Sequence, residues 1–233
     1  DKPPEPRDLS EALLKILSSP TVASKRWVYE QYDHEVGVKT VIKPGQAGAA
    51  VMRLPNGRFL AVSLDGNSKH SYLDPYHGAA GALAEGCRNV ISVGGEPVAM
   101  LDHLQFGDPG NPEVFWAFSE AVRGLADYCK RLSIPCIGGK VSFYNEDKVT
   151  HRAIKPSPVI MTIGLIEDER LLRRSAFNIK ADRVVVIGFT KDELGGSEYY
   201  EYLHGLCGGD VPKVDLDTEV KLHRAMRELF SRG

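Results

Sequence analysis

The segment from Pro97 to Glu146 constrains the fold of this chain more than any other stretch. It opens with an apolar run that leads to Asp102, continues through a helical pattern from 108 to 132, and closes with a second apolar run from Ile134. Strand, helix and strand are predicted in that order. This arrangement places Asp102 and the turn that begins at Gly138 at the carboxyl ends of two strands, where open α/β sheets commonly build ligand sites.

The second run breaks at Gly138 and Gly139, which a cation, a hydroxyl group and an acid closely follow. Paired glycines let a backbone approach a phosphate closely, because neither residue has a Cβ atom. An ordinary tight turn is the alternative explanation for an isolated pair of glycines, and spacing alone does not decide between the two.

Composition excludes several classes of protein. The chain has 233 residues, 42% of them hydrophobic and 26% charged, as in ordinary globular domains, which allows one large domain or two small ones. A net charge of -2 gives no electrostatic argument for binding nucleic acid or an anionic membrane. No apolar run approaches the roughly 20 residues of a membrane helix. The four cysteines lack the spacing of a zinc site and the density of a disulfide scaffold, which favours reduced thiols in a cytoplasmic protein.

The remaining pattern indicates an α/β chain with two units. Residues 1–24 read as a linker with a short helix, 25–156 as a first α/β domain, and 157–233 as a second domain too short to close a core. The predicted strands are 38–43, 58–65, 159–166 and 183–189. Helices are predicted to start at Asp74-Pro75 and Asn111-Pro112, where a capping residue precedes proline, and a last helix covers 219–230.

Three polar residues near the second predicted strand are candidate nucleotide contacts. Asp65 and Asn67 lie in a polar loop at the carboxyl end of that strand, and His77 lies in the first turn of the following helix. A capping or packing role is the alternative for His77, because most histidines in helices are structural.

Several separated motifs resemble one enzyme family, in the same order along the chain. They are Gly66-Asn67-Ser68, Asp74-Pro75-Tyr76-His77-Gly78, Asp102-His103-Leu104-Gln105-Phe106-Gly107-Asp108-Pro109, Gly138-Gly139-Lys140-Val141-Ser142-Phe143-Tyr144-Asn145-Glu146 and Leu194-Gly195-Gly196-Ser197-Glu198. They are similar to the second half of the large, synthetase subunit of phosphoribosylformylglycinamidine synthase. The resemblance runs from about Ser24 to the last residue.

This resemblance implies an architecture. The fold would be like that of aminoimidazole ribonucleotide synthetase, with an α/β domain whose sheet joins a partner sheet in a barrel. A flanking α/β domain, cut short here, would follow. The implied partners are the missing N-terminal half of the same subunit, a glutamine amidotransferase subunit and a small bridging subunit.

The resemblance also implies an activity and site residues. The family uses ATP and magnesium to turn formylglycinamide ribonucleotide and ammonia into formylglycinamidine ribonucleotide. Asp102 and Gly139 fall on ATP-contacting positions and Ser142 on a substrate-contacting one. Lys140 falls where the family usually has an asparagine ligand of magnesium; an ammonium group cannot ligate a cation. Either this metal position is lost or Lys140 contacts the triphosphate. No histidine here inherits the family's catalytic role.

Two other functional classes remain open at this stage. One is another member of the superfamily, such as a selenophosphate synthetase or a thiamine-phosphate kinase, although Phe115-Trp116 and Tyr144-Asn145-Glu146 argue against this. The other is a non-catalytic scaffold half that holds a structural nucleotide. The fragment alone is expected to be inactive, and to form a homodimer through its unpaired sheet edge.

Overall fold

A six-stranded sheet organises the structure, a computed structural model that describes residues 2–150, 152–177 and 183–232. The strand order is β1-β2-β3-β6-β4-β5. The strands are β1 (Thr40–Ile42), β2 (Ala50–Arg53), β3 (Phe59–Asp65), β4 (Glu96–Gln105), β5 (Cys136–Ser142) and β6 (Ser157–Ile166). The α-helices are α1 (Leu9–Ser18), α2 (Arg26–Tyr29), α3 (Ser68–Leu73), α4 (Pro75–Ser92), α5 (Pro112–Leu132) and α6 (Leu216–Arg232); the short helices are η1 (Val36–Val38), η2 (Glu169–Leu171) and η3 (Tyr199–Leu203).

The predicted strand–helix–strand unit is confirmed as β4–α5–β5. These two strands are parallel, and every other pair in the sheet is antiparallel. A parallel pair needs a long crossover, which α5 supplies. The capping prediction also holds, because the Asn111 side chain accepts from the backbone N–H of Glu113 with Pro112 in the first turn. Asp74 and Pro75 start α4 in the same way.

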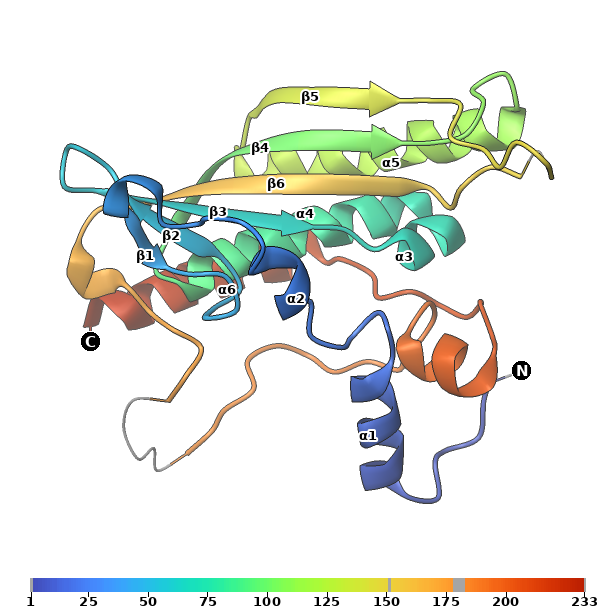
Figure 1. The fold of residues 1–233 in the computed structure, drawn as a ribbon, viewed down its shortest axis with the longest axis horizontal. Coiled ribbons are helices and arrows are strands. Elements are labelled where there is room, and N and C mark those ends of the chain that lie inside the picture. The colour runs from blue at the N-terminus through green and yellow to red at the C-terminus, as the bar shows by residue number, and fades with distance from the viewer. Residues whose placement is uncertain (1, 151, 178–182, 233) are drawn as a thin grey trace.

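Helices α4 and α5 cover one face of the sheet. Figure 1 shows both helices behind the strands, and α4 contacts α5, β3, β4 and β6. The main core lies between these layers; its largest fully buried side chains are Tyr128, Leu83, Phe106, Met100 and Ile160. Alternate residues of β6 are buried, while the intervening ones are only half-buried. The helices therefore bury one face of the sheet far more completely than the other.

The predicted domain boundary at 156/157 divides this sheet and needs correction. Strand β6 begins at Ser157 and pairs with both β3 and β4, so it is a central strand of the first unit. The Pro156-Ser157-Pro158 sequence looked like a linker because proline is uncommon inside strands. Here Pro158 is tolerated one residue from the strand's start.

The predicted strand at 183–189 is wrong. Its residues have no strand assignment, and Val184, Val185 and Val186 are 72–84% exposed. A continuous apolar run forms a buried strand only when a sheet is present to receive it. The predicted strand at 38–43 is shortened to Thr40–Ile42 because Gly37 adopts a φ of 72° inside η1. The predicted last helix is confirmed by α6.

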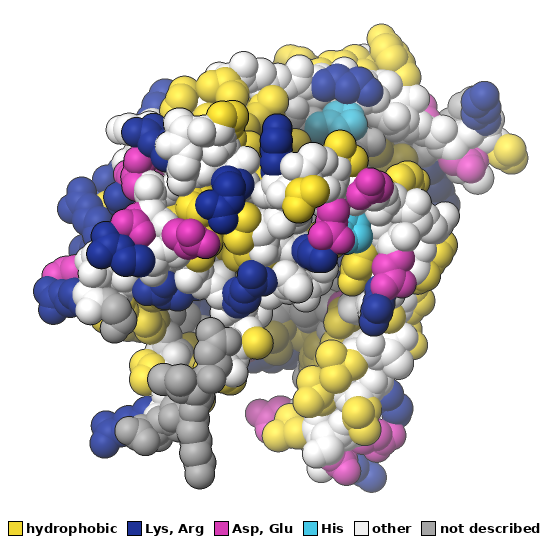
Figure 2. Space-filling model, turned by 60° about the vertical axis from the view of Figure 1, so that its left-hand side comes forward, with side chains coloured by type: hydrophobic (Ala, Val, Ile, Leu, Met, Phe, Trp, Pro, Cys, Tyr) yellow, Lys and Arg dark blue, Asp and Glu magenta, His cyan; other side chains and the backbone are white. Residues whose placement is uncertain are grey.

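The surface mixes charges of both signs. The face in Figure 2 carries Lys and Arg side chains with Asp and Glu among them. Ion pairs such as Arg58–Glu167, at 2.8 Å, join the β2–β3 turn to the segment after β6. Within the described ranges, no helix combines the length and apolarity that crossing a bilayer requires.

Candidate functional site

Asp102 and Gly139 are neighbours across β4 and β5. The two residues are in register in the parallel pair. A Cβ atom added to Gly139 would lie 2.1 Å from Asp102 Oδ1, so the carboxylate occupies the space that a side chain would need. The Cys136 thiol lies 3.8 Å from Asp102 Oδ2. Burial raises the pKa of Asp102, while this thiol and His103 act in the opposite direction.

Two details of the predicted site are corrected by this geometry. Gly138 and Gly139 lie inside β5 and do not form a turn. Asp102 lies three residues before the end of β4 at Gln105, and not at its carboxyl end. The glycines were misassigned because Gly is depleted in strands, but an edge strand can use glycine where a neighbouring side chain approaches closely.

Lys140 and Ser142 lie on the other face of the sheet from the Asp102 side chain. Neighbouring residues of a strand point to opposite faces, and Lys140 follows Gly139, the partner of Asp102. Lys140 is exposed and is in register with His103, whose Nε2 atom is buried without a hydrogen-bond partner among the described residues. The expected residues therefore divide between two faces of one edge of the sheet.

The carboxyl ends of β4 and β5 are joined by a network around Asn145. Its side-chain amide donates to the Ser142 carbonyl oxygen at 2.8 Å and to the Phe106 carbonyl oxygen at 3.0 Å. Glu146 Oε1 accepts from the backbone N–H of Asp108 at 2.9 Å. Tyr144, with a φ of 62°, donates its backbone N–H to the Gly107 carbonyl oxygen. The two motifs that resemble the synthetase family are thus held together at adjoining strand ends.

Asp65 occupies the same row of the sheet as Asp102. Asp65 pairs with Ile160 and Ile160 pairs with Asp102, which places the two aspartates two strands, or about 10 Å, apart on the helix-covered face. Asp65 is 9% exposed and accepts from Ser63 and from the Asn89 amide. Burial raises its pKa despite these donors. Its contacts are those of a buried structural group.

Asn67 and His77 both contribute to helix starts. Asn67 caps α3 by accepting from the backbone N–H groups of Lys69 and His70. His77 donates its backbone N–H to the cap Asp74, and its ring meets Tyr76 edge-on at 5.0 Å. Asp74 is the capping residue here, and the ring contact of His77 is of the kind that the packing alternative predicts.

Sequence reasoning missed an ion cluster beside Asn67. Lys69 Nζ contacts the carboxylates of Glu198 and Glu201, and Lys155 Nζ reaches Glu201 at 3.2 Å. The Lys69 and Glu198 side chains are only 16% and 15% exposed. The cluster joins α3 to η3, although Lys69 and Glu198 are 129 positions apart in the sequence. Nothing in the sequence indicated this contact beyond the charge of each residue.

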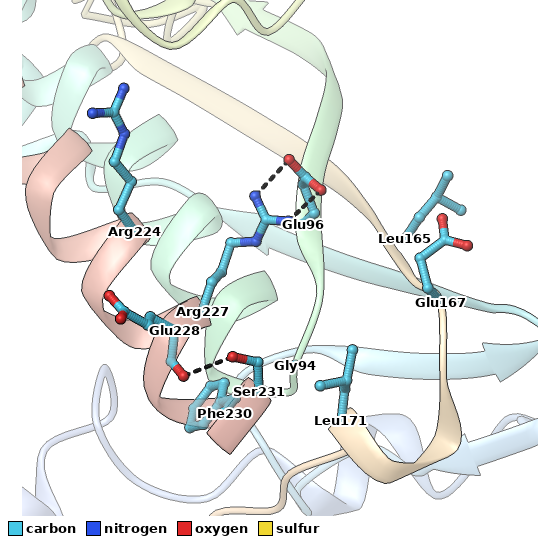
Figure 3. Close-up of a pocket in the computed structure, with 10 residues that line it drawn as sticks. All are labelled: Gly94, Glu96, Leu165, Glu167, Leu171, Arg224, Arg227, Glu228, Phe230 and Ser231. Carbon is cyan, nitrogen blue, oxygen red and sulfur yellow. Dashed lines mark hydrogen bonds and ion pairs between the residues drawn. The ribbon is translucent and has the colours of Figure 1, made fainter. Parts of the chain in front are cut away.

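The cavities lie elsewhere. Figure 3 shows one of about 380 Å³ between α6, the start of β4 and η2. Its Arg227 is bound by both oxygens of Glu96, at 2.6 and 2.7 Å, so the guanidinium group already has a partner. A second cavity of about 500 Å³ includes Asn67 and the small-residue face of α4. Neither cavity includes Asp102 or Gly139.

The described residues offer no preformed cage of side chains for a metal ion. Among residues 2–150, 152–177 and 183–232, no group of three or more His, Cys, Asp or Glu side chains is placed to hold a metal. Lys140, at the position that the resemblance assigns to a magnesium ligand, is a donor without a lone pair.

Curated relatives match nearly all of this chain. It is 45% identical, over 98% of its length, to the phosphoribosylformylglycinamidine synthase subunit PurL of Methanocaldococcus jannaschii. It is 48% identical, over 96% of its length, to the corresponding subunit of Thermococcus kodakarensis. The chain spans 32% and 31% of these two relatives, or about a third of their length.

Solved structures agree with the fold. The PurLQS structure from Thermotoga maritima superposes with a TM-score of 0.70 at 27% identity, covering 91% of this chain and 31% of that one. T. maritima PurL complexed with AMPPCP gives 0.63 at 25% identity, over 91% and 31% of the two chains. The complex with FGAR gives 0.63 at 25% identity, over 91% and 30%.

Residues 46–166 match the family described as AIR synthase related protein, N-terminal domain. This range begins just before β2 and ends at the last residue of β6, so it contains five of the six strands of the sheet together with α3, α4 and α5. It supports the corrected limit of the first unit at Ile166. The chain therefore belongs to the AIR synthase related family.

Proposed function

We propose that this chain is the second synthetase-like half of a phosphoribosylformylglycinamidine synthase, an ATP-dependent carbon–nitrogen ligase. The reaction joins formylglycinamide ribonucleotide and glutamine-derived ammonia, with ATP, to give formylglycinamidine ribonucleotide, ADP and phosphate. One observation carries the proposal: the motifs at 102–109 and 138–146 meet at adjoining strand ends, in a chain 45–48% identical to synthase subunits.

Each site residue has a proposed task that its chemistry allows. Asp102 accepts hydrogen bonds from the nucleotide, and Gly139 offers an unhindered backbone beside it. The Ser142 hydroxyl, at the end of β5, hydrogen-bonds the ribonucleotide. Lys140 neutralises phosphate charge from the opposite face. We place no magnesium ligand on this chain, and we propose that any metal is held by the remainder of the polypeptide.

The proposed setting is a larger cytoplasmic assembly. The half-buried face of the sheet joins a partner sheet from the rest of the same subunit in a barrel, and a flanking α/β domain continues beyond α6. A glutaminase subunit and a small bridging subunit deliver ammonia. The printed title of the T. maritima PurLQS structure supports an assembly of this kind. Four cysteines without disulfide bonds are compatible with a reducing compartment.

The direct test is an activity assay of the isolated chain. Formylglycinamide ribonucleotide, ATP and an ammonium salt should give no product with the purified 233 residues, while the full-length protein turns over. Turnover by the isolated chain at the roughly 1–10³ s⁻¹ usual for enzymes would contradict the proposal. In the full-length protein, Ser142→Ala should raise the KM for the ribonucleotide, and an unchanged KM would remove Ser142 from the substrate site.

A scaffold half that holds a structural nucleotide is the second candidate. The lysine at position 140 favours it, because an ammonium group cannot ligate a metal ion at the position that the resemblance assigns to a magnesium ligand. Under this alternative, Asp102→Asn in the full-length protein would lower the amount of bound nucleotide and the melting temperature but leave kcat unchanged. A fall in kcat would favour the catalytic assignment.

A further inference from the structure

The Asp102 carboxylate lies where the side chain of its neighbour on β5 would normally be. The hypothetical Cβ atom of Gly139 would be 2.1 Å from Asp102 Oδ1, 2.9 Å from Cγ and 3.2 Å from the backbone oxygen. Real Cβ atoms do not approach other atoms so closely. At Gly138 the same construction meets only Leu101 Cδ2 at 3.6 Å, an ordinary contact. A side chain would therefore have room at position 138 but would collide with the Asp102 carboxylate at position 139.

The backbone does not require glycine at position 139. Neither Gly138 nor Gly139 is among the residues with positive φ, and both lie within β5, after an irregularity in its pairing with β4 between Cys136 and Gly138. Alanine fits this conformation without strain. Among the described residues, the atoms nearest to this position all belong to Asp102 and the two closest are in its carboxylate, so the structural reason for glycine at 139 is steric.

Cys136 supplies a nearby hydrogen-bond donor. Its thiol has two acceptors within reach, the Gly138 carbonyl oxygen at 3.3 Å and Asp102 Oδ2 at 3.8 Å. The neighbouring titratable groups are His103 on β4 and Cys129 on α5; the Asp102 and Cys136 charges both affect the Cys129 thiol, whose pKa burial raises to about 11. Among the described residues, no Lys or Arg forms an ion pair with Asp102. Strand β5 therefore supplies both the space that the Asp102 carboxylate occupies, at Gly139, and a hydrogen-bond donor to it, from Cys136.

We propose that Gly139 and Cys136, both on the edge strand β5, are positioning residues that fix the place of the Asp102 carboxylate over the Gly139 backbone. Gly139 acts by lacking a side chain and Cys136 by donating its thiol hydrogen. This inference rests on the proposed role of Asp102 in nucleotide binding. It gives Gly139 a task distinct from a backbone contact with the nucleotide.

The first experiment needs no nucleotide. Carbon-detected NMR of the Asp102 carboxyl group in the 233-residue chain should report a pKa above the ordinary aspartate value. Gly139→Ala should expel the carboxylate toward solvent and reduce its proton affinity at least about threefold, whereas the matched control Gly138→Ala should leave it unchanged. Cys136→Ala should raise the proton affinity, because a hydrogen bond to the ionised form is lost, and Cys136→Ser should restore it.

The second experiment is a double-mutant cycle for nucleotide affinity in the full-length protein. If Gly139 acts through Asp102, Gly139→Ala should weaken binding in the wild type but add little loss to Asp102→Asn. Additive losses would overturn the positioning role and favour a backbone contact. If the NMR changes appear while neither substitution alters affinity, the positioning stands and the nucleotide assignment of Asp102 fails. If Gly139→Ala leaves the Asp102 titration as unchanged as the control Gly138→Ala does, the inference is wrong.

Discussion

The ion cluster at Lys69 gives a sharp stability prediction. Lys69 Nζ bridges Glu198 and Glu201, which belong to a segment far along the chain. The exposed fractions of the three side chains are 16%, 15% and 34%. Replacing Lys69 with Met keeps the apolar stem but leaves two carboxylates close together without their shared cation. The perturbation therefore tests how strongly charge holds α3 to η3.

The expected magnitude lies between two limits. An exposed pair contributes about 0–1 kcal/mol, whereas removing one partner of a fully buried pair costs about 3–5 kcal/mol. A cluster that is partly shielded from water should fall between them, so Lys69→Met should lower the free energy of unfolding by about 2 kcal/mol. For a chain of this size that corresponds to a fall in Tm of about 4–8 °C.

Urea denaturation followed by circular dichroism is the assay. The matched control is Arg170→Met, which breaks the pair with Asp168 at 2.6 Å, in which the arginine side chain is 89% exposed, and should leave the midpoint unchanged. Equal midpoints for Lys69→Met and wild type would refute the reasoning. So would a loss no larger than that of the control, because the cluster would then behave as a surface pair.

The same cluster has a defined pH window. The Lys69 contacts lower the pKa values of Glu198 and Glu201, so their contribution is present above the unfolded glutamate pKa and is lost as pH falls through the folded values. The pKa of Lys69 is raised overall by its two carboxylate partners, against the effect of burial. Its contribution is lost only as pH rises past the ordinary lysine value. The difference between wild type and Lys69→Met should therefore be constant near neutrality and shrink in acid.

Three further predictions concern the core, the sheet edge and Lys140. Phe106→Ala should lower the free energy of unfolding by about 3–5 kcal/mol in urea titrations, since Phe106 is fully buried and packs edge-on against Phe118, whereas exposed Phe177→Ala should have little effect. Sedimentation equilibrium should reveal a homodimer of the isolated chain, because the outer strands of the sheet have unpaired edges; a constant monomer mass over a hundredfold concentration range would refute it. In the full-length protein, Lys140→Ala should weaken nucleotide binding and Lys140→Asn should partly restore it with greater magnesium dependence, and identical magnesium titrations would make the residue a bystander.

Local sequence accounts for the helices and for the central crossover. Asn111-Pro112 and Asp74-Pro75 were readable as helix starts because capping is a contact between residues two or three positions apart. The spacing of apolar residues after Asn111 identified α5 for the same reason, since helical periodicity involves only near neighbours. The two flanking runs then predicted β4 and β5, with Asp102 and the glycine pair at the carboxyl ends of these two strands.

Strand order and side-chain partners were decided by contacts between distant parts of the chain. Nothing local places β6 between β3 and β4, and its prolines indicated a linker instead. The run from Val184 has the composition of a buried strand, yet it lies exposed because the described residues offer it no sheet. Gly139 looked like part of a phosphate turn until its register with Asp102 was known. Helix propensity and capping depend on neighbours in sequence. Strand pairing, the face of the sheet on which a side chain lies, and burial depend on which surfaces come into contact, and only the tertiary structure determines those contacts.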